Sequence, residues 1–152
     1  MTLTFQVERL ADVEPECLTL TELAFEELGM FKGELPLDID WPRYRHMEAQ
    51  GTLFLMTARD DSDELVGYVA HNVAAMLHYR PIRLARDTAH YLHPAHRGGA
   101  NGARMLMAAE RALKRFGVQV VGYHQKIASD REALFVRLGY EPMERIYYKR
   151  IG

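Results

Sequence analysis

The stretch HYLHPAHRGGANGARML, residues 90–106, decides how this chain is interpreted. Three histidines stand three residues apart, and a run of glycines and alanines then leads into an apolar stretch. Such a pattern is compatible with a metal site, with a phosphate-binding turn, or with an ordinary turn between a strand and a helix.

A metal site is the weakest of the three interpretations. On a strand, alternate side chains point to opposite faces, so His90 and His93 should diverge. Pro94 prevents a continuous helix that would bring the three imidazoles together. No cysteine or carboxylate stands nearby at a recognised metal-ligand spacing. We therefore expect no metal cofactor.

The phosphate-binding interpretation depends on the segment RGGANG, residues 97–102. It follows a predicted strand and precedes a predicted helix, whose first N–H groups have no internal partner and carry partial positive charge. Glycine and alanine let the backbone approach phosphate oxygens closely. The segment fits neither the Walker A motif nor the dinucleotide-binding glycine motif. The glycines alone do not separate a phosphate site from a tight turn.

Periodicity predicts the elements on either side of this stretch. Pro15 is expected near the start of the first helix. Ser129, three residues before Glu132, predicts a capping box for the last helix. We expect strands at 3–10, 80–94, 118–126 and 145–151, and a hairpin at 52–77 that turns at Asp60–Asp63. We expect helices at 12–28, at 41–50, from the glycine stretch to Gly117, and at 129–139. This order predicts an α/β arrangement with a largely antiparallel start.

Composition narrows the class of protein. One cysteine among 152 residues permits no internal disulfide, which favours a reducing compartment. The chain shows no secretory signal pattern and no apolar run near the roughly eighteen residues of a membrane span. We therefore expect a cytoplasmic protein without a membrane partner. Residues 1–77 carry 15 acidic and 5 basic side chains, and residues 78–152 carry 6 and 14. This asymmetry indicates either two kinds of ligand or solvated faces that differ.

The succession of motifs resembles the GNAT superfamily of acyl-CoA-dependent N-acetyltransferases, especially phage-encoded members. RGGANG resembles their coenzyme A loop, Arg/Gln-x-x-Gly-x-Gly/Ala, with Ala100 in place of the middle glycine. LHPAHRGG resembles the exit of their fourth strand, and ALFVRLGYEP their fourth helix. The resemblance implies one GNAT-like domain over residues 1–152. Its fold would be α/β (α+β): a mixed, mostly antiparallel central sheet with helices on both faces and strands four and five splayed apart.

The resemblance also implies a co-substrate, acetyl-CoA, held between those two strands and the glycine loop. Backbone groups of the strand end would contact the pantetheine arm, and loop amides the diphosphate. Ser129 stands near the position of a family asparagine that contacts this arm, although helix capping is an alternative. The implied cofactor-binding residues are Tyr91, Leu92, His93, Arg97, Gly98, Gly99, Ala100, Asn101, Gly102, Ala103 and Ser129.

For catalysis, the resemblance implies direct attack by an amine, which must first lose a proton. Asp87 occupies the strand position where some members place a glutamate base, and His90 is the alternative base. An exposed carboxylate and a surface histidine are the structural alternatives. Phe135 replaces the tyrosine that often protonates the leaving thiolate, and Tyr140 is expected to pack in the core.

The acceptor would be a small-molecule amine or a protein amino group. Acidic residues near the loop after the first helix favour a cationic acceptor: Glu26, Glu27, Glu34, Asp38 and Asp40. A non-catalytic CoA-binding or regulatory module is the alternative function. Nucleic-acid binding is not expected, because the basic residues of helix three read as a solvated face. The last predicted strand would either pair in a homodimer or form a plain edge.

Overall fold

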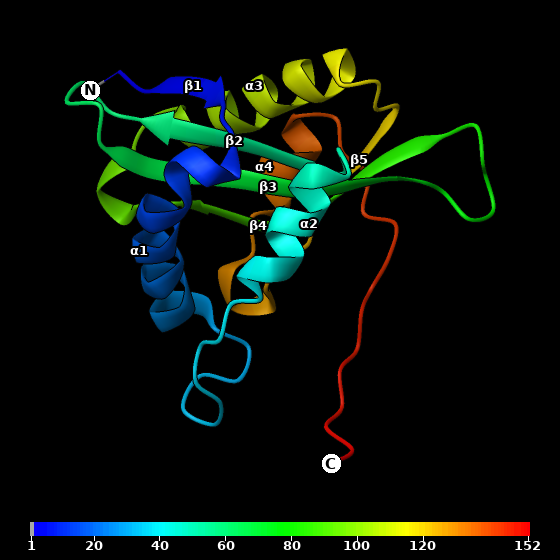
Figure 1. Ribbon diagram of the computed structural model, residues 1–152, viewed down its shortest axis with the longest axis horizontal. Coiled ribbons are helices and arrows are strands. Elements are labelled where there is room, and N and C mark those ends of the chain that lie inside the picture. The colour runs from blue at the N-terminus through cyan, green and yellow to red at the C-terminus, as the bar shows by residue number, and fades with distance from the viewer. Residues whose placement is uncertain (1) are drawn as a thin grey trace.

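A computed structural model describes residues 2–152 (Figure 1). These residues form, in order, β1 (Thr4–Val7), α1 (Leu10–Leu28), α2 (Trp41–Ala49), β2 (Leu53–Arg59), β3 (Leu65–Ala75) and β4 (Arg83–Leu92). A 3-10 turn at Pro94–His96 leads into α3 (Asn101–Arg115), β5 (Val120–Gly122), a second 3-10 turn at Ile127–Ser129, and α4 (Glu132–Arg137).

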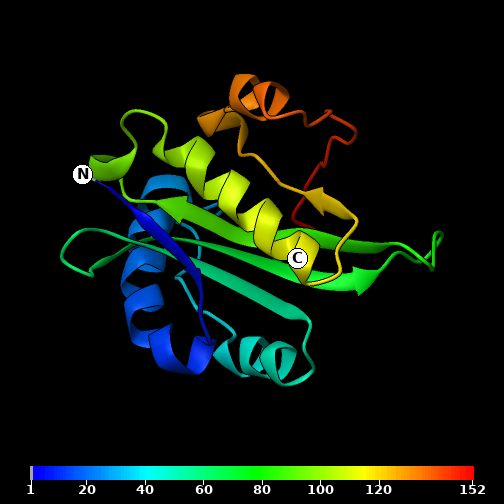
Figure 2. The same ribbon diagram turned by 90° about the horizontal axis from the view of Figure 1, so that it is seen from above.

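Within residues 2–152 the five strands make one sheet in the order β1-β2-β3-β4-β5. The first four pair antiparallel, whereas β5 runs parallel to β4. Helices α1 and α2 lie on one face, and α3 and α4 lie on the other (Figure 2). The mixed, mostly antiparallel sheet with helices on both faces is the GNAT-like architecture expected from the sequence.

Side chains along each strand alternate between two apolar layers, one on each face of the sheet. Leu53 and Leu55 of β2 pack under α1 and α2, whereas Phe54 and Met56 pack under α3. All seven residues of β2 are buried, because helices cover both faces of this strand. Leu106, Ala109 and Leu113 of α3 are buried, whereas Phe116, expected on the same face, is exposed. Gly117, at φ +83°, follows the helix where a stop was expected.

Two expectations about where helices begin are wrong. Helix α1 begins at Leu10 and contains Pro15 in its interior. The N–H of Leu10 donates to the carboxylate of Glu48 on α2, a tertiary cap that local sequence cannot reveal. Ser129 does not cap α4, because the helix begins later, at Glu132, after Arg131. The side chain of Asp130 instead accepts from the N–H of Glu132.

The C-terminal strand expected at residues 145–151 is also absent from the described chain, in which residues 140–152 have no regular secondary structure. Alternation of side chains favours a strand only where a neighbouring strand supplies hydrogen bonds. The segment instead makes ion pairs, of which Arg150 with Glu34 at 2.8 Å ties it to the loop after α1. Strand β5 is likewise shorter than the expected 118–126.

Candidate functional site

The glycine stretch forms an exposed turn before α3. Gly98, Gly99 and Ala100 are exposed, and Gly99 has a φ of +63°, which favours glycine there. The first backbone bond into α3 is from Arg104 N–H to the carbonyl of Ala100, at 2.8 Å. Among residues 2–152, the backbone N–H groups from Gly98 to Ala103 have no acceptor. Six successive amides at a helix start are therefore available to an anion.

The side chain of Asn101 bonds to groups other than these amides. Asn101 Nδ2 donates to the carbonyl of His96 at 3.1 Å, and its Oδ1 accepts from Arg104 at 3.3 Å. A Cβ added to Gly102 would have one heavy atom within 4 Å, at the end of the Leu134 side chain, 4.0 Å away. Gly99 thus needs glycine for its backbone conformation, whereas a Cβ at Gly98 or Gly102 would meet no close neighbour.

Arg97, at the start of the glycine stretch, is paired with a carboxylate. Its guanidinium nitrogens lie 2.6 and 2.7 Å from the two carboxylate oxygens of Glu27 on α1. Its Nε donates to the carbonyl of Leu92 at 2.7 Å, and the guanidinium lies 5.2 Å above the Tyr91 ring. These hydrogen bonds lower the pKa of Glu27. Arg97 therefore joins the end of α1 to the end of β4.

The end of β4 is partly engaged with the rest of the chain. His93 N–H donates to the carbonyl of Val66 at 2.8 Å, and its Nδ1 accepts from Ala95 N–H at 3.3 Å. Tyr91 is buried in the α1 layer, where its hydroxyl donates to Glu27 at 3.1 Å. The N–H and the carbonyl of His93, the latter accepting from His96 N–H at 2.9 Å, and the carbonyl of Leu92 are thus engaged within the protein.

Strands β4 and β5 pair over a short distance only. Their register ends at Arg86 opposite Gly122, yet β4 continues to Leu92. Residues 87–92 of β4 therefore have no strand partner on the β5 side within the described chain. An extended ligand can add to such an open edge as a further strand would.

A bulge in β4 brings the two predicted catalytic residues together. The register with β3 passes from Ala89 opposite Ala70 to Asp87 opposite His71, and skips Thr88. In a regular strand, residues 87 and 90 would face opposite sides; the extra residue puts both on one face. His90 Nδ1 lies 2.8 Å from Oδ2 of Asp87. Both side chains face the α3 side of the sheet, where the His90 ring lies 5.5 Å from Tyr123.

A second imidazole, that of His124, shares the same carboxylate. Oδ1 of Asp87 accepts the backbone N–H of His124 at 2.8 Å and lies 2.6 Å from its Nδ1. The Asp87 side chain is 4% exposed, against 28% for His90 and 43% for His124. Asp87 is therefore buried, and it is not the exposed carboxylate that was the structural alternative.

The hydrogen bonds determine which ring nitrogens carry protons. Burial raises the pKa of Asp87, but hydrogen bonds from His90 and His124 outweigh it and hold the pKa below its usual value. An ionised carboxylate only accepts, so Nδ1 of each imidazole must donate. The neutral rings then keep a lone pair on Nε2. Both histidines can accept a proton at that atom while Asp87 stabilises the resulting charge.

Sequence reasoning missed His71, which lies beside this cluster. His71 is fully buried on β3 between Phe54 and Tyr123, and neither ring nitrogen has a partner in the described chain. Burial lowers its pKa to about 4, so it is neutral at pH 7. Its position between the inward-facing Val69 and Val73 was a signal that could have revealed it.

Aromatic side chains cover the cluster on the α4 side. Phe135, Tyr140 and Tyr123 have ring centroids within 5.6 Å of one another. The Tyr140 hydroxyl donates to Glu110 at 2.7 Å, so Tyr140 packs as expected. The buried Tyr123 hydroxyl has no partner among residues 2–152, and burial raises its pKa. Ser129 lies in the 3-10 turn before α4, where its N–H donates to Lys126.

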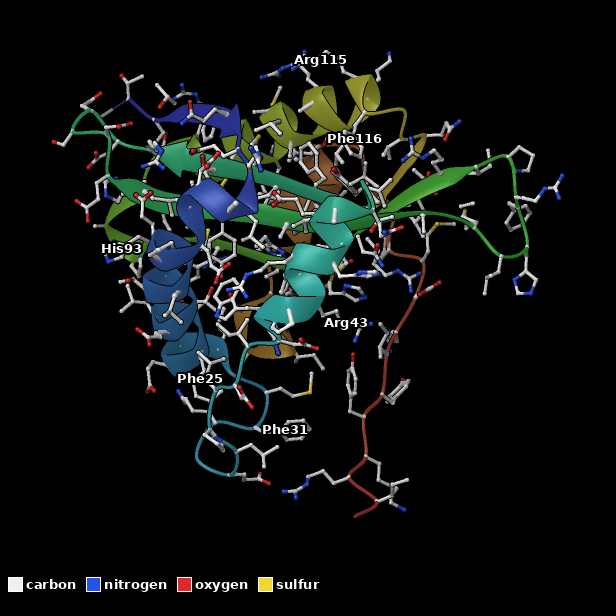
Figure 3. All side chains as sticks on the ribbon, in the orientation of Figure 1. Phe25, Phe31, Arg43, His93, Arg115 and Phe116 are labelled. Atoms are coloured by element: carbon white, nitrogen blue, oxygen red, sulfur yellow. The ribbon has the colours of Figure 1, made fainter. Side chains whose placement is uncertain are left out.

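The acidic residues near the first loop separate into two groups. Glu26 and Asp38, with Glu22, line an open pocket of about 530 Å³ whose wall on α1 includes Phe25, labelled in Figure 3. The others have partners: Glu27 binds Arg97, Glu34 binds Arg150, and Asp40 accepts from Arg43 N–H. This pocket adjoins α1, on the face of the sheet opposite Asp87.

Among residues 2–152, no group of three or more histidine, cysteine or acidic side chains is arranged to hold a metal ion. His90 faces Asp87, whereas the His93 ring lies 5.9 Å from His96. Within the same residues, no helix combines the length and apolar character that crossing a membrane requires.

No protein-family model and no curated protein matches the sequence. Solved structures do match along the whole chain. A predicted acetyltransferase with acetyl-CoA from Clostridium acetobutylicum has a TM-score of 0.71 and 11% identity, covering 99% of this chain and 97% of its own. An aminoglycoside acetyltransferase from an uncultured soil metagenomic sample, in complex with sisomicin, has a TM-score of 0.73 and 16% identity, with coverage of 99% and 97%.

A transcriptional regulator from Bacillus halodurans matches with a TM-score of 0.74 and 18% identity, covering 99% of this chain and 100% of its own. At such identities the likeness concerns the fold, and it gives no support to the narrower resemblance to phage-encoded members. The chain therefore has the fold of acetyltransferases of the GNAT type.

Proposed function

We propose that this protein is an acetyl-CoA-dependent N-acetyltransferase acting on a primary amine. The observation that carries the proposal is the junction of two backbone surfaces that offer hydrogen-bonding groups. Within the described part of the chain, the edge of β4 at residues 87–92 has no strand partner on the β5 side and leads into six amides without acceptors, Gly98 to Ala103. A molecule that joins an extended amide-bearing arm to a diphosphate is complementary to both surfaces.

The residues at this junction divide the binding of acetyl-CoA between them. The amides of Gly98, Gly99, Ala100, Asn101, Gly102 and Ala103 bind the diphosphate, and the open edge around Tyr91, Leu92 and His93 binds the pantetheine arm. Arg97 acts by holding β4 against α1, because Glu27 already neutralises its charge. Ser129, just before α4, is the further contact to the arm in this proposal.

The reaction is direct transfer. The amine nitrogen attacks the carbonyl carbon of the thioester, a C–N bond forms, and the C–S bond breaks to release the CoA thiolate. The nitrogen must lose a proton to a base. His90 Nε2 takes this proton, and Asp87 holds the imidazole in the required tautomer and stabilises its positive charge. His124 is a second imidazole held by the same carboxylate.

The acceptor is a small-molecule amine or a protein amino group that reaches the thioester from the α3 face, where His90 lies. The acidic pocket beside α1 lies on the other face, so its carboxylates do not share a site with the base. The thiolate takes its proton from water. Phe135 has no proton to give, and the raised pKa of Tyr123 makes it a poor donor.

A second candidate function is a CoA-binding regulatory protein without turnover. Two observations favour it: phenylalanine at position 135, and the regulator of the same fold. Calorimetry with acetyl-CoA, followed by thiol-release assays with a panel of amines, separates the candidates. Binding with release of thiol supports the enzyme, and binding without release for any amine supports the regulator. Failure to bind acetyl-CoA would overturn both.

A further inference from the structure

A small apolar cavity lies between the sheet and the helices α1 and α2. Its volume is about 50 Å³, and its lining includes Ala70, Ala89, Ile39 and Tyr44. The hydroxyls of Thr21 and Tyr68, which also line it, are 2.9 Å apart and bond to each other. The lining that a bound group would contact is therefore mainly apolar.

Ala89 connects this cavity to the open edge of β4. It belongs to the stretch 87–92 that lacks a strand partner on the β5 side in the described chain. Because of the bulge at Thr88, Ala89 faces the α1 and α2 layer, whereas its neighbour His90 faces Tyr123 on the other side. One residue of the edge thus borders the cavity, and the next holds the base.

We propose that this cavity receives the acyl chain of the CoA thioester and limits its length. The inference rests on the proposed function, which places the thioester beside the open edge. A chain that enters the cavity leaves the thioester carbonyl accessible from the face of His90. The two faces of the sheet then have separate tasks: one selects the acyl group, and the other removes the proton from the amine.

The volume sets the expected chain length. A cavity of about 50 Å³ accommodates at most roughly three to five carbon atoms, because one water-sized group needs at least about 10–15 Å³ of such space. Acetyl to butyryl groups therefore fit, and an octanoyl group does not. Ile39 and Trp41 form a wall between this cavity and the larger acidic pocket, because both residues line both spaces.

The test measures binding of CoA, acetyl-CoA, butyryl-CoA and octanoyl-CoA by calorimetry. Each methylene that enters an apolar cavity tightens binding by about fourfold. We expect butyryl-CoA to bind about tenfold or more tightly than CoA, and octanoyl-CoA to lose this gain. Ala89→Leu should abolish the advantage of butyryl-CoA over CoA. Ala74→Leu, at an exposed position of β3, is the matched control.

A second variant keeps the inference testable if Ala89→Leu does not fold. Ile39→Ala, on the segment before α2, removes part of the wall and should move the preference from butyryl-CoA toward octanoyl-CoA. If CoA binds but wild-type affinity is independent of the acyl chain, or if neither variant changes the preference, the inference fails and the proposed function stands. If CoA itself does not bind, the proposed function fails first.

Discussion

The carboxylate of Asp87 on β4 binds His124, which lies just beyond β5, through both its backbone N–H and its imidazole, at 2.8 and 2.6 Å. These bonds come immediately after the last β4–β5 pair, Arg86 opposite Gly122. The Asp87 side chain thus accepts a backbone hydrogen bond at the position where the β4–β5 ladder would otherwise continue. One buried carboxylate both sets where the strands part and orients two imidazoles at the opening.

Asp87→Asn should lower kcat by about a hundredfold or more, the usual contribution of a general base, with the KM for acetyl-CoA nearly unchanged. An amide can donate to Nδ1, which would favour the tautomer with the proton on Nε2. Steady-state thiol release checks this. Asp12→Asn, at an exposed position of α1, is the control. A normal kcat in Asp87→Asn would remove Asp87 from the mechanism.

The two imidazoles should not be equivalent. His90→Gln removes the base beside the open edge and should reduce kcat nearly as much as Asp87→Asn. His124→Gln removes a group that lies past the end of β5 and keeps its backbone bond to Asp87, so its effect should be smaller. Equal losses in kcat would mean that both rings take part in proton removal.

Stability should fall in mild acid because of His71. Burial lowers its pKa from 6.5 to about 4, so between these values the unfolded state binds a proton that the folded state does not. This contribution to the free energy of unfolding is fully present above about pH 6.5. It is lost as the pH falls toward 4, and the loss reaches up to about 3 kcal/mol. Urea unfolding at several pH values measures it. His71→Leu should remove this part of the pH dependence of the free energy of unfolding. His78→Leu, on the exposed hairpin tip, should not.

The pairing of Arg97 with Glu27 should be worth more than an exposed ion pair. Arg97→Lys loses the paired contacts to Glu27 and the bond from Nε to Leu92, and we expect the free energy of unfolding to fall by about 1 kcal/mol. Arg45→Lys alters a similar paired contact with Glu14 at a more exposed position and should change stability less. Equal changes in urea midpoints would contradict the joining function of Arg97.

A negative charge at the start of α3 should separate CoA binding from folding. Asp is a good N-cap residue, so Ala100→Asp should preserve or raise the melting temperature. Its carboxylate would occupy the free amides and repel the diphosphate, weakening CoA binding by about tenfold or more. Ala100→Asn, of similar shape and capping ability but neutral, should weaken binding less. Equal affinities of the two variants would argue against an anion at this turn.

Local pattern was enough to predict much of this molecule. The glycines, the small residues and the following apolar periodicity predicted the turn and α3, since each depends on neighbours within a few residues. The bulge at Thr88 was not predictable, because it arises from the register of β3 against β4. The contact of His124 with Asp87 depends on where β5 ends, and the cap of Glu48 on Leu10 depends on how two helices meet.

The most direct test of the account is a crystal structure of the protein with acetyl-CoA. We predict that diphosphate oxygens accept hydrogen bonds from the amides between Gly98 and Ala103, and that the pantetheine arm lies along residues 87–92 of β4. A diphosphate bound elsewhere, with those amides left to solvent, would contradict the proposed acetyltransferase.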